Sequence, residues 1–277
     1  MSPVRRTSVV ARAARSVAAR GGPWHAVPTD AIVFGTLSVV GFVLLWQVAS
    51  TFWVVSMLFP PPLKTLATWW EMVQDGSILY HVRVSLVRIA VGFAIGTVVG
   101  VPVGLAMGLF TPVLVALEPY VQFLRFVPPI AWLIPAILWF GIGEISKTFL
   151  IVYTTIFLVL VNTMAGVRTI PRNQIRAART FGLSRWQMFA WVTLPAIMPR
   201  IFTGMRIAMG NSFAAVVGAE LIAAEAGLGY LITESATWMA SDRMFSGMLT
   251  LGLLGILADV SFRAGIRRYA ARYFMTQ

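Results

Sequence analysis

Six long apolar runs, separated by shorter polar segments, organise the sequence. An α-helix needs about 20 apolar residues to cross the roughly 30 Å hydrocarbon core of a bilayer, and each run has about that length or more. Stretches of this kind with few charges are typical of membrane-spanning helices. We therefore predict an all-α membrane protein with about six transmembrane helices, over residues 31–55, 84–109, 117–140, 148–167, 201–224 and 244–264.

The second run carries a glycine at every fourth position. Positions four apart share one face of an α-helix, so these glycines form a groove against which another helix backbone can approach closely. Helix packing is the favoured role of the set, and contact with a solute is not needed to explain it. The set consists of Gly92, Gly96, Gly100, Gly104 and Gly108.

Prolines interrupt the third run at Pro128 and Pro129, and again at Pro135. Each proline removes a backbone donor and displaces the carbonyl four residues before it, so free carbonyls are expected at membrane depth. Lipid cannot satisfy them, and this face must therefore meet protein or a water-filled cavity. Broken helices at such depth often build transport sites, whereas a kink that serves packing alone explains the prolines equally well.

Residues 56–81, between the first two runs, are predicted to form an external segment. Pro60, Pro61 and Pro62 break the first helix, and apolar side chains then recur three and four positions apart. This spacing is typical of an amphipathic helix at a membrane surface, ended by Gly76. The apolar positions are Leu63, Leu66, Ala67, Trp70 and Val73.

Composition agrees with the apolar pattern. The 277-residue chain is 58% hydrophobic and only 12% charged, with a mean hydropathy of +0.80, and a water-soluble domain carries roughly twice that charged fraction. The net charge of +12 is gathered in the tail at 1–30, the segment 168–200 and the C-terminal end, all next to apolar runs. This positive-inside pattern places all three, including both tails (1–30 and 269–277), in the cytoplasm, and nucleic-acid binding is unnecessary to explain the charge.

The arginine-rich loop 173–200 separates the fourth and fifth runs. A short helix is expected over residues 174–181, ended by Gly182 in the left-handed conformation. Ser184 can cap a second helix over 185–193, after which Pro195 and Pro199 are expected to bend the chain into the next run. Small residues in the loop leave a shallow surface on which another protein's backbone can lie.

The loop resembles the EAA loop of ABC importer permeases, in the order A-A-x3-G-x9-[IV]-x-L-P. The matching residues are Ala177, Ala178, Gly182, Val192, Leu194 and Pro195. The glutamate of the motif falls on Arg176, beside Arg179, which leaves open any contact that a carboxylate would make there. The resemblance implies that this loop couples the chain to a cytoplasmic ABC ATPase.

The resemblance extends over roughly residues 45–270, through residues 60–76, Ser85 to Arg88 with the glycine run, and Arg125 to Glu144. These segments occur in the order seen in the nitrate, taurine and alkanesulfonate importer permeases. The implied fold is that of a type I ABC importer (MetI-like) permease, with residues 82–268 as its transmembrane domain. The implied setting is the cytoplasmic (inner) membrane of a bacterium, and the implied partners are an ATPase pair that holds ATP and Mg, a second permease copy, an external solute-binding protein and membrane lipids.

Enzymatic chemistry is not expected on this chain. It has no cysteine and only two histidines, and metalloprotease and serine-hydrolase motifs are absent. Residues 141–148, GIGEISKT, nearly spell a phosphate-binding loop, but Ser146 replaces its second glycine and no strand precedes it. We therefore expect no cofactor and no metal on this chain, and ATP hydrolysis on a separate polypeptide.

Polar side chains within the apolar runs are the candidate pathway residues. Arg88 and Arg125 can hold an oxyanion through their planar donors, or instead snorkel or pair, for example Arg125 with Glu118. Asn162, Asn211 and Ser212 can line the pathway beside Pro128 and Pro129, or instead join helices. Glu220 and Asp259 are expected near span ends in ion pairs.

Two readings of function remain open from the sequence. The first is the permease subunit of an ATP-driven importer for a small solute, such as a sulfonate, taurine or nitrate. The alternative is a secondary transporter driven by an ion gradient, which requires a buried acidic pair at mid-depth and usually inverted repeats, and neither is clear. The solute and the choice between homodimer and heterodimer are not decided, since relatives of similar sequence carry pyrimidine-type vitamin precursors.

Overall fold

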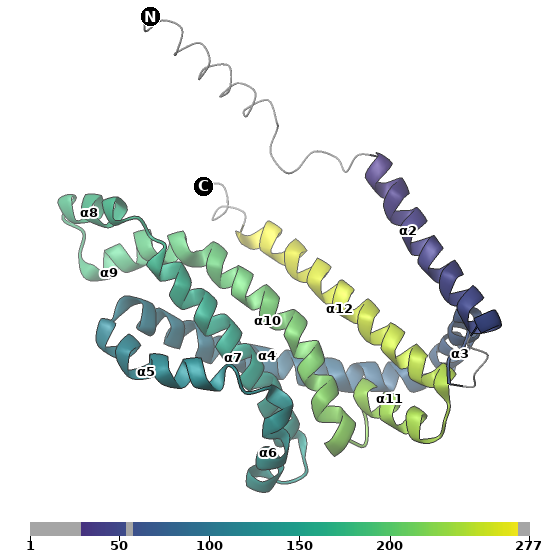
Figure 1. Ribbon diagram of the computed structural model, residues 1–277. Coiled ribbons are helices and arrows are strands. Elements are labelled where there is room, and N and C mark those ends of the chain that lie inside the picture. Colours follow the sequence, from purple (N-terminus) through teal and green to yellow (C-terminus); the bar gives the residue numbers. More distant parts are fainter. Residues whose placement is uncertain (1–28, 54–57, 271–277) are drawn as a thin grey trace, which may run out of the picture. The chain divides into compact units, whose positions relative to one another are not determined.

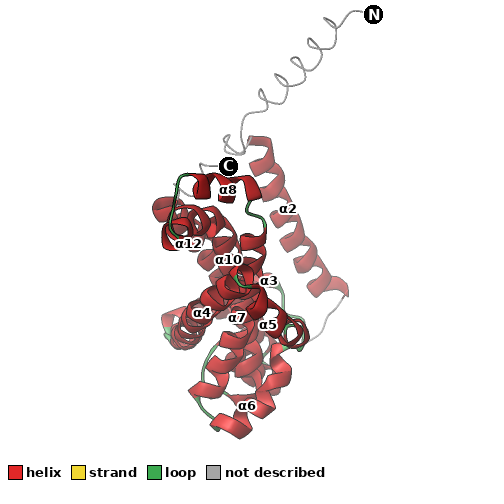
Figure 2. Ribbon diagram, turned by 90° about the vertical axis from the view of Figure 1, so that its left-hand side faces the viewer, coloured by secondary structure: helices red, strands yellow, loops and turns green. Residues whose placement is uncertain are grey.

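The computed structural model describes residues 29–53 and 58–270. All secondary structure in these two ranges is helical, with no strand in either (Figure 2). The basic tail predicted over 1–30, except for its last two residues, lies outside the described residues, as do residues 54–57 and 271–277.

The first predicted span forms a unit of its own. Helix α2 covers Thr29–Val48 and continues as a π-helical turn, η1, over Ala49–Trp53. Its side chains are apolar and largely exposed, among them Phe34, Leu37 and Phe42. A helix that is apolar all round is suited to lipid and not to water.

Three long helices form the centre of the second unit. Helix α4 (Ser77–Leu109) and helix α10 (Leu194–Ala223) both pack against α7 (Glu144–Arg168), as Figure 1 shows. Helix α4 begins seven residues before the predicted span, directly after Gly76, which adopts the left-handed conformation (φ +77°). The predicted span started later because the first turns of α4 contain polar residues, and the prediction followed only the apolar run.

The glycines of α4 lie on the face that contacts α7. A Cβ atom at Gly92 would lie 2.6 Å from the Ile151 Cβ atom, and one at Gly104 would lie 2.6 Å from the Leu160 carbonyl oxygen. A Cβ atom at Gly96, Gly100 or Gly108 would lie 2.5, 3.0 or 2.6 Å from its nearest α7 atom. The two backbones therefore approach as the repeat of small residues allows.

The third predicted span is a broken helix. Helix α5 (Thr111–Leu124) and the pair η2 (Pro129–Trp132) and α6 (Leu133–Phe140) meet at an angle of 93°. The break falls at Pro128 and Pro129, as predicted. The second interruption, at Pro135, is not observed, because Pro135 is the third residue of α6, in the first turn, where a helix does not need its N–H.

Helix α3 (Pro62–Gln74) packs against α12 (Ser241–Ala270) through polar contacts. The Thr68 hydroxyl donates to the Asp242 carboxylate at 3.2 Å, and the Trp69 indole N–H donates to the Thr250 hydroxyl at 2.9 Å. The predicted apolar stripe of α3, represented by Leu63 and Trp70, stays exposed on another face. The helix is therefore held by one face and presents a second, apolar face outward.

The number of spans agrees with the prediction. Five described helices are long and apolar enough to cross a membrane, and the bent pair of residues 111–124 and 129–140 makes six if it counts as one span. The segment 172–193, at one end of α7 and α10, is called here the loop end of the bundle. The end with Glu144 and Glu220 is the opposite end.

Candidate functional site

The loop end begins with a short amphipathic helix, α8 (Arg172–Thr180). Gly182 follows in the left-handed conformation (φ +72°), its N–H donating to the Arg179 carbonyl at 2.9 Å, and the Leu183 N–H donates to the Ala178 carbonyl at 3.3 Å. These bonds satisfy carbonyls at the helix end. The predicted helix and its end at Gly182 are confirmed.

Ser184 starts the second helix of the loop, α9 (Arg185–Met188). Its hydroxyl accepts from the Gln187 N–H at 3.3 Å, and the Gln187 side-chain oxygen accepts from the Ser184 N–H at 2.9 Å, which is a reciprocal capping box. The helix then passes through a π-helical turn, η3 (Phe189–Thr193), into α10.

The bend predicted at Pro195 and Pro199 is wrong. Residues 185–222 form a continuous helical span, with Pro195 in the first turn of α10 and Pro199 inside it. Helix starts tolerate proline, and the π-helical turn precedes Pro195 without ending the helix. The chain reverses at Gly182 instead, between α8 and α9.

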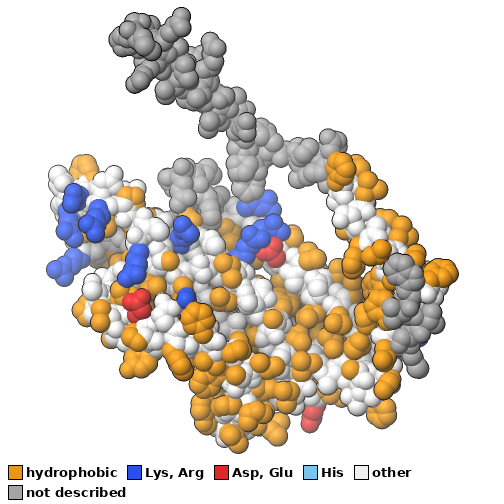
Figure 3. All heavy atoms as spheres, in the orientation of Figure 1, with side chains coloured by type: hydrophobic (Ala, Val, Ile, Leu, Met, Phe, Trp, Pro, Cys, Tyr) orange, Lys and Arg blue, Asp and Glu red, His pale blue; other side chains and the backbone are white. Residues whose placement is uncertain are grey.

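The loop presents a basic and aromatic surface. Arg176, Ala177 and Arg179 are exposed on α8, whereas Ala178 is buried against the loop. Phe181 and Trp186 are 83% and 73% exposed. Val192, in η3, and Leu194 and Pro195, at the start of α10, are half-buried. Figure 3 shows arginine side chains gathered over this end of the molecule, while apolar side chains cover much of the same face elsewhere.

The break in the third span opens a second candidate site. A cavity of about 290 Å³ lies beside it, and four predicted pathway residues line it together: Arg125, Pro129, Asn162 and Asn211. The Tyr153 hydroxyl donates to the Leu124 carbonyl at 2.5 Å, so one carbonyl freed by the break has a protein partner. The face of the break is therefore in contact with protein on one side and with a cavity on another, and the sequence had predicted one or the other.

The remaining predicted pathway residues lie elsewhere. Pro128 precedes η2 but does not line the cavity. Ser212 is buried, 3.2 Å from the Thr155 hydroxyl, where it joins α10 to α7. The suggested pairing of Arg125 with Glu118 is not observed: the Arg125 guanidinium instead lies 4.7 Å from the ring centre of Phe126, and the ion pairs among the described residues do not include it.

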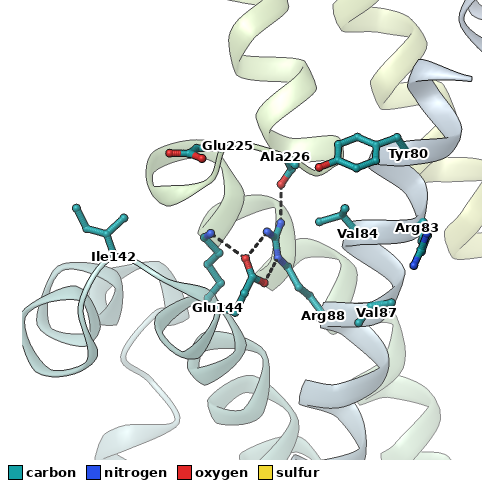
Figure 4. Close-up of a pocket in the computed structure, with 10 residues that line it drawn as sticks. Tyr80, Arg83, Val84, Val87, Arg88, Ile142, Glu144, Glu225 and Ala226 are labelled. Carbon is teal, nitrogen blue, oxygen red and sulfur yellow. Dashed lines mark hydrogen bonds and ion pairs between the residues drawn. The ribbon is translucent and has the colours of Figure 1, made fainter. Parts of the chain in front are cut away.

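Arg88 forms the centre of a polar network at the opposite end of the bundle. Its guanidinium binds the Glu144 carboxylate through Nε and Nη2, both at 2.6 Å, in a planar two-point contact (Figure 4). Nη1 donates to Glu220 at 2.8 Å and to the Ala226 carbonyl at 2.6 Å. A cavity of about 680 Å³ opens beside it, lined also by Arg83 and Glu225. In this structure the Arg88 donors are engaged by protein.

Glu220 connects the same network to α11 (Leu228–Thr237). Its side chain is 0% exposed, and it accepts from the Ser85 hydroxyl, Arg88 and the Gly229 N–H at 2.8 Å each. Gly227, at φ +125°, packs directly against the carboxylate, where any side chain would collide. Lys147 adds a second cation, 3.1 Å from Glu144. Two cations and two carboxylates thus balance each other.

Sequence reasoning singled out Arg88 but missed Glu144 as its partner. The only signal in the sequence is that Glu144 is a charged residue just before an apolar run. Asp259 is paired, as expected: Arg206 donates to it across α10 and α12 at 2.5 Å, and Arg263 lies 2.9 Å away. Within the described ranges, no group of three or more acidic or histidine side chains can hold a metal ion.

Residues 96–272 match the family described as the binding-protein-dependent transport system inner membrane component. The taurine transport system permease protein TauC of Escherichia coli is 36% identical over 241 residues, which are 84% of this chain and 86% of that protein. An Escherichia coli protein named as an aliphatic sulfonates transport permease, SsuC, is 39% identical over 223 residues, or 80% and 85% of the two chains.

Among solved structures, the MetNI methionine ABC transporter in inward-facing conformations contains a similar chain. The TM-score is 0.61 at 18% identity, over 69% of this chain and 95% of that chain. At this identity the likeness concerns the fold alone. It confirms the predicted fold of a type I ABC importer permease.

Proposed function

Because the chain belongs to the family of binding-protein-dependent transport system inner membrane components, we propose that it is the permease subunit of an ATP-driven importer in the cytoplasmic membrane of a bacterium. Its cargo is a small oxyanion such as a sulfonate, taurine or nitrate. The names of its relatives TauC and SsuC support this class of cargo. Two copies of the chain form the pathway, and an external binding protein delivers the solute.

The energy comes from a separate ATPase pair that binds ATP and Mg²⁺ and docks on the loop end. The observation that carries this proposal is the surface of α8 and α9. Ala177 is exposed and its small side chain leaves room for the backbone of a partner. The aromatic side chains of Phe181 and Trp186 in the same loop are exposed as well. Exposed aromatic and arginine side chains around small residues are typical of protein-binding surfaces.

Replacing Ala177 by tyrosine is expected to abolish association with the ATPase. Ala177 is exposed on α8, so the new ring does not disturb the core of this chain but occupies the space of the partner's backbone. The measurement is co-purification of the two subunits in mild detergent, followed by solute-stimulated ATP hydrolysis. Ala177→Ser is the matched control and should keep both. Solute uptake into ATP-free vesicles by the chain alone would instead support an ion-driven transporter.

The loop end and both termini lie in the cytoplasm in this proposal. The chain has no cysteine, so a single introduced cysteine reports one position. A membrane-impermeant maleimide should label Glu225→Cys, at the opposite end, in intact cells, and Thr180→Cys, on α8, only after permeabilisation. Both positions are exposed, and the cysteine-free parent gives the background. Labelling of Thr180→Cys in intact cells would reverse the orientation.

A further inference from the structure

Four arginine side chains are exposed on the two short helices of the loop end. Arg172, Arg176 and Arg179 lie on α8, and Arg185 is the first residue of α9. Positions four and seven residues further along share one face of an α-helix, so the three on α8 form a single row, called here the arginine stripe. Ala178, on another face of α8, is buried. The stripe therefore lies on the face that α8 does not use to pack against this chain.

The chain itself supplies no counter-charge to the arginine stripe. Between Glu144 and Glu220 the sequence contains no aspartate or glutamate. The ion pairs among the described residues include none of the four arginines on α8 and α9. Their guanidinium groups are therefore open to an anion from outside the chain.

Helix stability does not explain where these arginines lie. Arg172 and Arg185 each begin a helix, where the helix dipole favours an anion over a cation. Arg172 and Arg176 are four residues apart, a spacing at which like charges repel each other. The positive-inside pattern accounts for basic residues in such a loop, but not for their alignment on one helix face. Residues placed against local preference in this way are typical of functional surfaces.

We propose that the ATPase presents carboxylates to the arginine stripe, and that Arg176 and Arg179, beside the exposed Ala177, bind them. The proposal rests on the function proposed above and adds the charge of the partner's contact surface. Arginine suits this role because its planar donors match a carboxylate at two points. An ATPase suited to the glutamate of the EAA motif would present a cation at this point, and Arg176 would repel it. The contact therefore also selects among ATPases.

Anionic lipid headgroups are the alternative source of negative charge. A helix that binds a membrane surface combines basic side chains with a broad apolar face that enters the lipid. The exposed residues of α8 are arginine, asparagine, glutamine, threonine and one alanine, and its isoleucine, Ile175, is half-buried. Because α8 exposes no large apolar side chain for insertion into lipid, an acidic protein surface is the better match.

Reversal of one charge in the stripe tests this inference. Association of the full chain with the ATPase subunit of the same importer is measured in mild detergent without added lipid. Salt screens exposed charges, so the measurement is made at about 0.05 M and about 0.5 M NaCl. Arg176→Glu should weaken association about tenfold at the lower salt concentration and much less at the higher one.

Arg243→Glu is the matched control for the charge reversal. Arg243 is exposed near the start of α12, outside the loop end, and its replacement changes the net charge of the chain by the same amount. This variant should bind the ATPase as the unchanged chain does. Equal binding by Arg176→Glu, or a loss that is the same at both salt concentrations, overturns the inference.

Arg176→Lys identifies the partner's group directly. The chain has only two lysines, Lys64 and Lys147, and both lie outside the loop end. A water-soluble carbodiimide joins a lysine amine to an adjacent carboxylate as an amide. The Arg176→Lys chain should therefore become linked through residue 176 to an aspartate or glutamate of the ATPase, as peptide mapping by mass spectrometry shows. Arg243→Lys should form no link through residue 243.

The outcomes separate this inference from the proposed function. A complex that forms with Arg176→Lys but gives no link through residue 176 overturns the acidic contact and leaves ATPase docking in place. An unchanged chain that binds no ATPase at either salt concentration refutes the proposed function, and this inference with it.

Discussion

Replacing Glu220 by alanine should destabilise the folded chain by about 3–5 kcal/mol, the usual effect of removing one partner from a buried ion pair. The carboxylate accepts hydrogen bonds from three groups, the Ser85 and Arg88 side chains of α4 and the Gly229 N–H at the start of α11. Without it, one Arg88 N–H, the Ser85 hydroxyl and the Gly229 N–H lose their acceptor in a buried position, and water does not replace it. The measurement is the thermal unfolding midpoint of the chain purified in detergent.

Glu225→Ala is the matched control for this prediction. Glu225 lies five residues further along the chain and lines the neighbouring cavity, but it is exposed and belongs to none of the ion pairs among the described residues. Its loss should change stability by less than about 0.5 kcal/mol. Should Glu220→Ala unfold at the same temperature as Glu225→Ala, the network around Arg88 does not stabilise the fold.

The local structure of the loop end was predictable because it depends on neighbours in sequence. Gly182 needs only its own freedom at positive φ, and Ser184 needs only Gln187 three residues on. The glycine repeat of α4 was likewise predictable, because its four-residue spacing alone places the glycines on one face of the helix. The passage of α9 into α10 was not predictable, because a proline can either end a helix or occupy its first turn, and packing decides between the two.

The polar network of Arg88 could not be derived from the sequence. Its partners Glu144 and Glu220 lie 56 and 132 residues away, and only the packing of α4 against α7 and α10 brings them together. The cavity at the break is an intermediate case. The prolines predicted a wet or protein-covered face, but the meeting of Arg125 with Asn162 and Asn211 depends on how α5, α7 and α10 pack.

The continuous helical span over 185–222 gives the loop end a direct connection to the opposite end. Helix α9 belongs to the proposed docking surface, and Glu220 belongs to the network around Arg88. No turn separates them, although the π-helical turn η3 gives the span one irregular point. A displacement of α9 by a docked partner therefore acts on α10 along its axis, and not through a flexible loop.

Replacing Gly104 by alanine should lower stability by about 1–3 kcal/mol, the usual cost of overpacking a tight contact. The new Cβ atom would lie 2.6 Å from the Leu160 carbonyl oxygen and 2.8 Å from the Thr163 Cβ atom. The first is a backbone atom and cannot rotate away, so α4 and α7 must separate locally. Helix propensity alone gives the opposite sign, since alanine is favoured over glycine by about 1 kcal/mol.

Gly252→Ala separates these two effects. Gly252 lies within α12, another membrane-spanning helix, and a Cβ atom there would meet nothing within 4 Å. This variant should keep or raise the thermal unfolding midpoint in detergent, while Gly104→Ala lowers it. If both variants shift the midpoint in the same direction and by the same amount, close approach of α4 to α7 is not what the glycine repeat provides. A lower midpoint for Gly104→Ala alone establishes the repeat as the contact that holds the two helices together.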